Sequence, residues 1–311
     1  MKEKIVLPGG AGLVGQNLVV QLKQFGYSNI VVIDKHLKNI AILKKFHPDI
    51  EVIFADLAEA GDWEAVFDGA SSVVMLQAQI GGNSYQDYVR NNLQSTKNIL
   101  QAIKLYKVSY LVHISSSVVK SVADDFYTRT KIAQEEMVLE SGIPCVVLRP
   151  TLMFGWYDRK HLGWLSRMML KVPFFPIPGD GKFMRQPLYA MDFCEIIVSA
   201  ISKKMKNHIY DITGLERIDY VDIIRAIKIS IGAKCHLIHI PYHAFYALLA
   251  IWAYFDSNPP FTTRQLKALV TKDSFEVIDW PLLFNVNPTP FNIAISETFG
   301  HPKNSKTFLD F

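Results

Sequence analysis

A tyrosine and a lysine stand four residues apart at Tyr127 and Lys131, inside a stretch with a helical pattern. This spacing places both side chains on one face of a helix, one turn apart. A cation beside a phenol favours the phenolate, so the pair predicts a Tyr127 pKa below its ordinary value of about 10. Such a phenol can exchange a proton with an alcohol or sugar hydroxyl. Taken alone, the pair is more often an ordinary surface contact.

Three serines, Ser115, Ser116 and Ser117, precede this pair and follow the apolar run 110–114. In a doubly wound sheet, ligands bind outside the carboxyl ends of the strands. A hydroxyl at that place, ahead of the Tyr127 helix, can hydrogen-bond the reacting oxygen. A serine-rich connection without function is the competing interpretation.

A glycine-rich turn at Gly9, Gly12 and Gly15 lies between the apolar runs 5–7 and 18–20. The first glycine permits a tight turn, and the second lets the backbone approach a pyrophosphate. The third lets the following helix pack closely on the strand. Because that helix presents free N–H groups at its start, the turn predicts a dinucleotide site.

An acidic residue, Asp34, ends the next apolar run, 19 residues after Gly15. A carboxylate there accepts hydrogen bonds from an adenosine ribose and repels a 2′-phosphate. The predicted cofactor is therefore NAD, although Lys35 and His36 could soften the preference over NADP.

The elements that must position these residues alternate through the first half of the chain. Continuous apolar runs are typical of parallel strands covered on both faces, and here they alternate with amphipathic stretches, the longest over about 85–106. This order predicts an α/β fold with a doubly wound parallel sheet of the Rossmann type. The predicted strands are 5–7, 30–33, 52–55, 73–76, 110–114 and 145–148.

The pattern changes at about Thr151, where prolines and glycines begin to interrupt shorter elements, including helices near 192–202 and 220–231. We therefore expect a dinucleotide-binding domain over residues 1–150. A smaller, mixed substrate-binding lobe over 151–311 is expected to interleave with it.

Composition narrows the class of protein. The net charge is +4 with no run of Lys or Arg, which argues against nucleic-acid binding. The three cysteines are far apart, and the first residues show no signal-peptide pattern, so we expect a cytoplasmic protein. His236 and His239 would point to opposite faces of a strand, so no metal site is predicted.

The most hydrophobic segment is Ala244–Phe255, whose 12 residues fall short of the roughly 20 that a bilayer span needs. We expect a buried packing helix of the second lobe. The alternative is a helix lying at a membrane surface, with Phe245, Leu248, Leu249, Trp252 and Phe255 turned to lipid.

Taken in order, these motifs resemble the extended short-chain dehydrogenase/reductase superfamily, and within it the NAD-dependent epimerase/dehydratase family. The resemblance runs from the glycine turn to a segment at Tyr189–Asp192. It implies that Ser117 orients the substrate hydroxyl, that Tyr127 is the acid/base, and that Lys131 holds the nicotinamide ribose. The implied cofactor-binding residues are Gly9, Gly12, Leu13, Val14, Gly15, Asp34, Asp56, Leu57, Leu76, Gln77, Ala78, Asn92, Tyr127, Lys131, Arg149 and Pro150, and the implied substrate residues are Ser116, Ser117 and Arg185.

Three departures from the family pattern bear on the reaction. Pro8 stands where a threonine is usual, and only nine residues separate Ser117 from Tyr127. Val118 and Val119 replace the Thr-Asp-Glu run of sugar-nucleotide 4,6-dehydratases, which ranks dehydration below the other reactions.

We therefore expect an NAD-dependent epimerase or ketoreductase that acts on a sugar nucleotide or a related hydroxylated substrate. A homodimer is one option for its assembly, and the sequence leaves the oligomeric state open. One alternative is a non-catalytic dinucleotide-binding protein similar to a subunit of respiratory complex I. Another is an epimerase of polyprenyl-diphosphate-linked sugars at a membrane surface.

Overall fold

The computed structural model describes residues 3–121, 124–255, 261–270 and 276–309. Its centre is a seven-stranded sheet in the order β11-β6-β5-β4-β1-β2-β3, in which every neighbouring pair is parallel. All six predicted strands are present in it. The strands are β1 (Lys4–Pro8), β2 (Asn29–Asp34), β3 (Glu51–Phe54), β4 (Ala70–Met75), β5 (Leu111–Ile114), β6 (Cys145–Pro150) and β11 (His208–Ile212).

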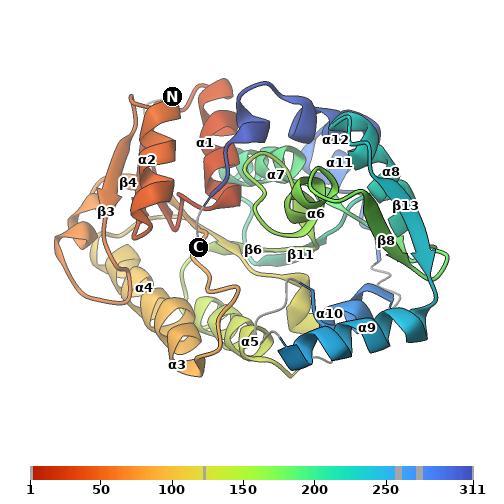
Figure 1. The fold of residues 1–311 in the computed structure, drawn as a ribbon. Helices are drawn as coiled ribbons and strands as arrows, with labels where there is room; N and C mark the ends of the chain where they lie inside the picture. Colours follow the sequence, from red (N-terminus) through yellow and green to blue (C-terminus); the bar gives the residue numbers. More distant parts are fainter. Residues whose placement is uncertain (1–2, 122–123, 256–260, 271–275, 310–311) are drawn as a thin grey trace.

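Helices cover both faces of this sheet, as Figure 1 shows. In β1, Ile5 and Leu7 pack into one hydrophobic core and Val6 into the other, because successive side chains of a strand point to opposite faces. One face is covered by α1 (Leu13–Gln24), α2 (Leu37–Phe46), α7 (Ala190–Lys203) and α11 (Trp280–Phe284), and the other by η1 (Asp62–Phe67), α4 (Ser95–Leu105) and α5 (Phe126–Leu139). The fold is a doubly wound, Rossmann-like α/β fold.

A second, smaller core lies in the C-terminal half. A parallel pair of strands, β8 (Phe174–Pro178) and β13 (His236–Ile240), contributes to it. The helices around it are α6 (His161–Met169), α8 (Tyr220–Ser230) and α12 (Phe291–Gly300). The short pairs β7 (Met153–Phe154) with β10 (Leu188–Tyr189), and β9 (Met184–Arg185) with β12 (Ile218–Asp219), complete the lobe. Between these elements the chain returns to the large sheet through α7 and β11.

The amphipathic stretch after β4 does not form one regular α-helix. It begins as α3 (Tyr85–Tyr88), continues as a π-helical segment, η2 (Val89–Gln94), and ends as α4. π-helical turns are rare and are frequent at functional sites. Here the turn contains Asn92, one of the predicted cofactor-binding residues.

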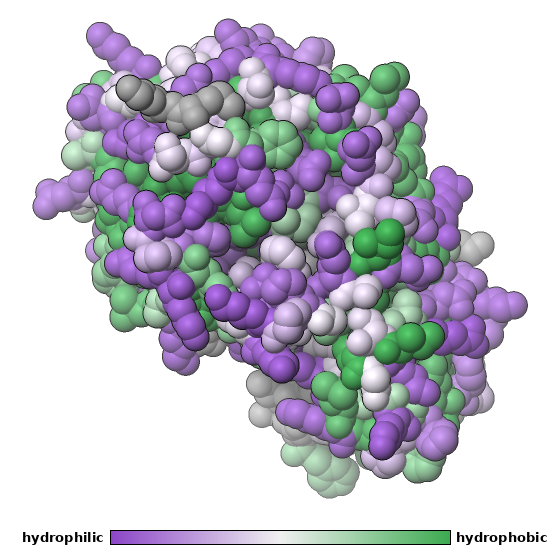
Figure 2. Space-filling view, turned by 90° about the horizontal axis from the view of Figure 1, so that it is seen from above, coloured by the Kyte–Doolittle hydropathy of each residue, from purple (hydrophilic) through white to green (hydrophobic). Residues whose placement is uncertain are grey.

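The apolar segment expected to be a buried packing helix is largely exposed, which corrects that prediction. It forms α9 (Tyr242–Phe255), which packs on α10 (Thr263–Val270) at the lower edge of the molecule in Figure 1. Along α9 only Phe245 and Leu249 are buried. None of the described helices is both long enough and apolar enough to cross a bilayer. Figure 2, seen from above, shows a face that is mostly hydrophilic, with smaller hydrophobic groups between the polar ones.

Candidate active site

The glycine turn has the geometry of a phosphate cradle. Gly9 has a φ of +76°, and a Cβ atom there would lie 2.5 Å from the backbone of Gln77. A Cβ on Gly15 would lie 2.2 Å from the Gly10 carbonyl oxygen, so these positions require glycine. At Gly12 an added Cβ would meet only ordinary contact, at 3.5 Å from the Gly9 oxygen. The backbone is therefore open on the Gly12 side, where a ligand could approach it.

The start of α1 leaves its backbone donors available to an anion. Gly12 is the N-cap residue, no side chain caps the helix, and its first turn carries no acidic residue. The first N–H groups of a helix lack partners within the helix and favour negative charge. Leu13 and Val14, predicted to contact the cofactor, form this first turn.

Asp34 lies at the end of β2 and is buried beside the turn. Its carboxylate accepts hydrogen bonds from the backbone N–H groups of Ala11, at 3.0 Å, and His36, at 3.0 Å. The carboxylate is thus held in place against the glycine turn, and its remaining lone pairs can accept further hydrogen bonds.

A second carboxylate, Asp56, lies beyond the end of β3 and carries a cluster of charges. Arg90 from the π-helical turn donates to it at 2.5 Å, and Lys35 donates to it at 3.2 Å. Asp56 also accepts the Ala58 N–H, and these cationic and backbone donors hold its pKa below the ordinary value despite the opposing effect of burial. Lys35 reaches Asn91 as well, at 2.6 Å, so it faces the neighbouring side chains rather than Asp34.

Asn92, which is fully buried, joins two segments of the site. Its side chain accepts the Gln79 N–H at 2.6 Å and donates to the Thr130 hydroxyl at 2.9 Å. Gln79 lies in the loop after β4, and Thr130 lies on α5. The predicted cofactor residue Asn92 therefore fixes the β4 loop to the helix that carries Tyr127.

Tyr127 and the serine segment meet at the carboxyl end of β5. The hydroxyl that hydrogen-bonds Tyr127 belongs to Ser116, which also caps the short helix η3 (Ser117–Lys120) by accepting the Val118 N–H. Burial raises the pKa of Tyr127, and the Ser116 hydrogen bond opposes that rise. The expected downward shift is therefore wrong for this structure.

Lys131 does not lower the Tyr127 pKa because its ammonium group is engaged elsewhere. Its Nζ donates to the Ile114 carbonyl oxygen, at 2.9 Å, and to the side chain of Gln134. Lys131 is only 1% exposed, and burial lowers its pKa to about 7, with Glu135 opposing that shift. The i,i+4 spacing placed the two side chains on one helical face, but backbone and amide partners determine where the amine lies.

A buried ion pair lies behind the serines. Glu135, one turn after Lys131, accepts hydrogen bonds from Nε and Nη2 of Arg149 and from the Ser115 hydroxyl. These contacts join β5, α5 and β6. Arg149, predicted to contact the cofactor, thus holds this junction. Sequence reasoning missed Glu135 and Gln134, whose i+4 and i+3 spacing from Lys131 was the available signal.

Arg185, predicted to face a substrate phosphate, lies on β9. Its guanidinium donates to the backbone oxygens of Leu269, on α10, and Met184. The phosphate role stays a prediction.

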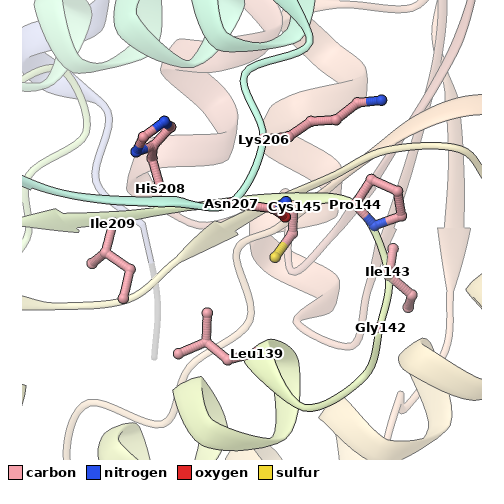
Figure 3. A pocket seen from close by; sticks show the side chains of 9 residues that line it. All are labelled: Leu139, Gly142, Ile143, Pro144, Cys145, Lys206, Asn207, His208 and Ile209. Carbon is pink, nitrogen blue, oxygen red and sulfur yellow. The ribbon is translucent and has the colours of Figure 1, made fainter.

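A pocket of about 420 Å³ lies at the amino end of β6. Figure 3 shows its lining, which comes from the end of α5, the segment leading into β6 and the start of β11. Cys145 begins β6, whereas Pro150 ends it, so this pocket is at the sheet edge opposite the serines and the glycine turn. It is unconnected with the chemistry described above.

The residues present suit a dinucleotide. The open Gly12 side, the uncapped start of α1 and the held Asp34 carboxylate provide groups for a pyrophosphate and a ribose. The buried Oε1 atom of Gln77, beside the turn, has no hydrogen-bond partner among the described residues. A ligand donor would satisfy it.

Comparison with known sequences agrees with this geometry. The profile of the NAD dependent epimerase/dehydratase family matches residues 5–213, which include the glycine turn, Tyr127 and Lys131. The chain belongs to this family. NAD, expected from Asp34, is the cofactor in the family's description.

Individual relatives of this epimerase/dehydratase chain are distant. It is 26% identical over 271 residues to an uncharacterized UDP-glucose epimerase of Bacillus subtilis, covering 75% of this chain and 84% of that protein. It is 24% identical over 246 residues to a trifunctional UDP-glucose 4,6-dehydratase, epimerase and reductase of Arabidopsis thaliana, covering 68% of this chain. That match spans only 36% of the plant protein.

Two solved structures share the fold along nearly the whole chain. UDP-glucose 4-epimerase of Thermotoga maritima, with UDP-glucose, superposes with a TM-score of 0.75 at 17% identity, covering 96% of this chain and 98% of that one. UDP-glucuronic acid 4-epimerase of Bacillus cereus, in complex with NAD, superposes with a TM-score of 0.72 at 22% identity, covering 96% of each chain.

Proposed function

We propose that the protein is an NAD-dependent enzyme that acts on a hydroxylated carbon of a sugar nucleotide. It either epimerises that carbon or interconverts its hydroxyl and keto forms. The observation that carries this proposal is the placement of Tyr127 beside the Ser116 hydroxyl at the carboxyl end of β5, on the helix that also carries Lys131. Relatives with UDP-sugar substrates in their names support the substrate class.

Each group of residues in the site would have a separate role in the reaction. The glycine turn and the start of α1 would hold the pyrophosphate, and Asp34 the adenosine ribose. A bound NAD would supply the acceptor for the hydride that leaves the sugar carbon. Tyr127 would take the hydroxyl proton in its phenolate form, which the Ser116 hydrogen bond favours, and Ser116 and Ser117 would hydrogen-bond the same substrate oxygen. Lys131 would hold the nicotinamide ribose. A ribose hydroxyl would then replace the Ile114 carbonyl oxygen as the hydrogen-bond partner of the Lys131 amine.

Epimerisation and net reduction differ in where the hydride ends. An epimerase returns it to the opposite face of the same carbon, so no reduced cofactor accumulates. A substrate deuterated at the reacting carbon therefore keeps its deuterium in the product of an epimerase. In a ketoreductase running in the oxidative direction, the deuterium leaves with the released cofactor. Dehydration stays the less favoured reaction, because Val118 and Val119 supply no acid beside the serines.

The test is turnover by Tyr127→Phe with UDP-glucose, UDP-glucuronic acid and UDP-N-acetylglucosamine as substrates. We expect kcat to fall roughly a hundred- to ten-thousandfold, while NAD affinity stays at the wild-type level. Tyr110→Phe is the matched control, since that hydroxyl bonds the Ala200 and Met205 carbonyl oxygens far from the serines. It should lower stability and leave kcat unchanged.

Equal turnover by Tyr127→Phe and wild type would refute the acid/base role. Tight NAD binding by a wild-type protein that converts none of these substrates would instead favour the non-catalytic alternative.

A further inference from the structure

We infer that α9 is a membrane-docking helix, which lies in the surface layer of a lipid bilayer and holds the second lobe against it. The inference does not depend on the proposed function. It begins from the exposure of α9: Leu248 is 55% exposed, Ile251 58% and Phe255 82%. These positions follow the i, i+3, i+7 spacing, so they form one apolar stripe along the helix.

The protein body holds the other side of α9. Phe245 and Leu249, one turn apart, are buried against Leu266 of α10, and Phe245 stacks on Phe261. The helix is therefore fixed at one face while the stripe stays outside. Trp252 lies at the boundary, 49% exposed.

Charge and residue type favour a lipid surface. Residues 235–255 contain no Asp, Glu, Lys or Arg, so insertion of this face desolvates no ionised carboxylate or amine of the segment. Trp252 and Tyr254 are exposed, and Trp and Tyr are the side chains enriched where hydrocarbon meets headgroups. A helix lying in that layer buries its apolar face only ~5–10 Å deep, so 14 residues suffice without spanning.

The size of the stripe argues against a second copy of the chain as its occupant. The exposed stripe lies on a single helix of 14 residues, about 21 Å long. A stable protein interface typically draws about 20–30 residues from each partner. A bilayer needs no matching surface, so this stripe can dock there by itself.

The position of α9 relates the docking to the substrate lobe. α10 packs on α9 and its Leu269 carbonyl accepts a hydrogen bond from Arg185, on β9. The two helices run side by side along one edge in Figure 1, away from α1 and α2. Docking through α9 would hold this lobe, rather than the glycine turn, next to the lipid.

The experiment is co-sedimentation of the full chain with vesicles of phosphatidylcholine, with and without phosphatidylglycerol. We expect binding that varies little with salt, because the stripe is uncharged. The affinity of the double variant Leu248→Ser/Phe255→Ser for vesicles should be lower by a factor of about ten or more. The control is Leu105→Ser/Ile229→Ser, which removes two comparably exposed apolar side chains, 66% and 80% exposed, from α4 and α8 and should bind like wild type.

Brominated phosphatidylcholine adds a second measurement. It should quench part of the tryptophan fluorescence of the wild type, and that part should disappear in Trp252→Phe, which still binds. Unchanged melting temperatures exclude unfolding as the cause. Three results would overturn the inference: no vesicle binding by the wild type, equal binding by the stripe variant, or a dimer without lipid that the stripe variant abolishes.

Discussion

The buried amine of Lys131 predicts a specific dependence of stability on pH. The folded protein gives Lys131 a pKa of about 7, against 10.5 for the ordinary side chain, because burial disfavours the charged form. Between these two values the unfolded chain binds a proton that the folded chain does not. The contribution of Lys131 to stability therefore rises with pH across this window and is lowest at and below its lower end.

The perturbation is Lys131→Met, which keeps an apolar chain of similar length and removes the titration. Each pH unit inside the window is worth about 1.4 kcal/mol, and pH 7 lies at its lower edge. From about pH 7 to about pH 9, wild type should therefore gain roughly 2 kcal/mol relative to Lys131→Met.

Urea unfolding at the two pH values measures this difference, with Lys97→Met, an exposed lysine on α4, as the control. The difference in the free energy of unfolding between Lys97→Met and wild type should be the same at both pH values. If the Lys131→Met difference is also the same at both pH values, the amine is charged in the folded protein and the reasoning is wrong.

Four further predictions concern the site. Gly15→Ala should lower the melting temperature, because its Cβ would lie 2.2 Å from a backbone oxygen, whereas Gly12→Ala should keep the fold and weaken NAD binding in calorimetry. Asp34→Ala should narrow the affinity difference between NAD and NADP; a wild type that binds NADP as well as NAD would contradict the role of Asp34. Glu135→Gln should cost about 3–5 kcal/mol by breaking a buried ion pair, against under about 1 kcal/mol for Arg225→Gln in an exposed pair. Ser116→Ala removes a hydrogen bond that lowers the Tyr127 pKa, so the pH at which activity rises should move upward; an unmoved profile would mean that Ser116 does not act on Tyr127.

The sequence alone determined six of the seven strands of the sheet and the edge at which their carboxyl ends meet; β11 was not predicted. Continuous apolar runs such as 30–33, alternating with amphipathic stretches, are typical of strands buried on both faces, and all six predicted runs are strands. The glycine spacing was equally informative, because a missing Cβ at Gly9 and Gly15 is a local steric requirement. Since parallel strands end at one edge, the sequence also placed Asp34, the serines and Tyr127 in the same region.

Only the tertiary structure decided how these side chains are used. The partner of Lys131 is the Ile114 carbonyl rather than Tyr127, and the serine that reaches Tyr127 is Ser116. Both outcomes depend on the distances between α5 and β5. The spacing of residues along α5 gives no information about those distances.

The exposure of the apolar helix α9 is a second feature that only the tertiary structure decided. Its apolar composition favoured a buried helix, although the same residues also suit a helix at a lipid surface. Burial depends on what else packs there, and α10 covers only the side of Phe245 and Leu249. The chain determines that α9 is apolar, and the packing of its neighbours determines that most of it faces outward.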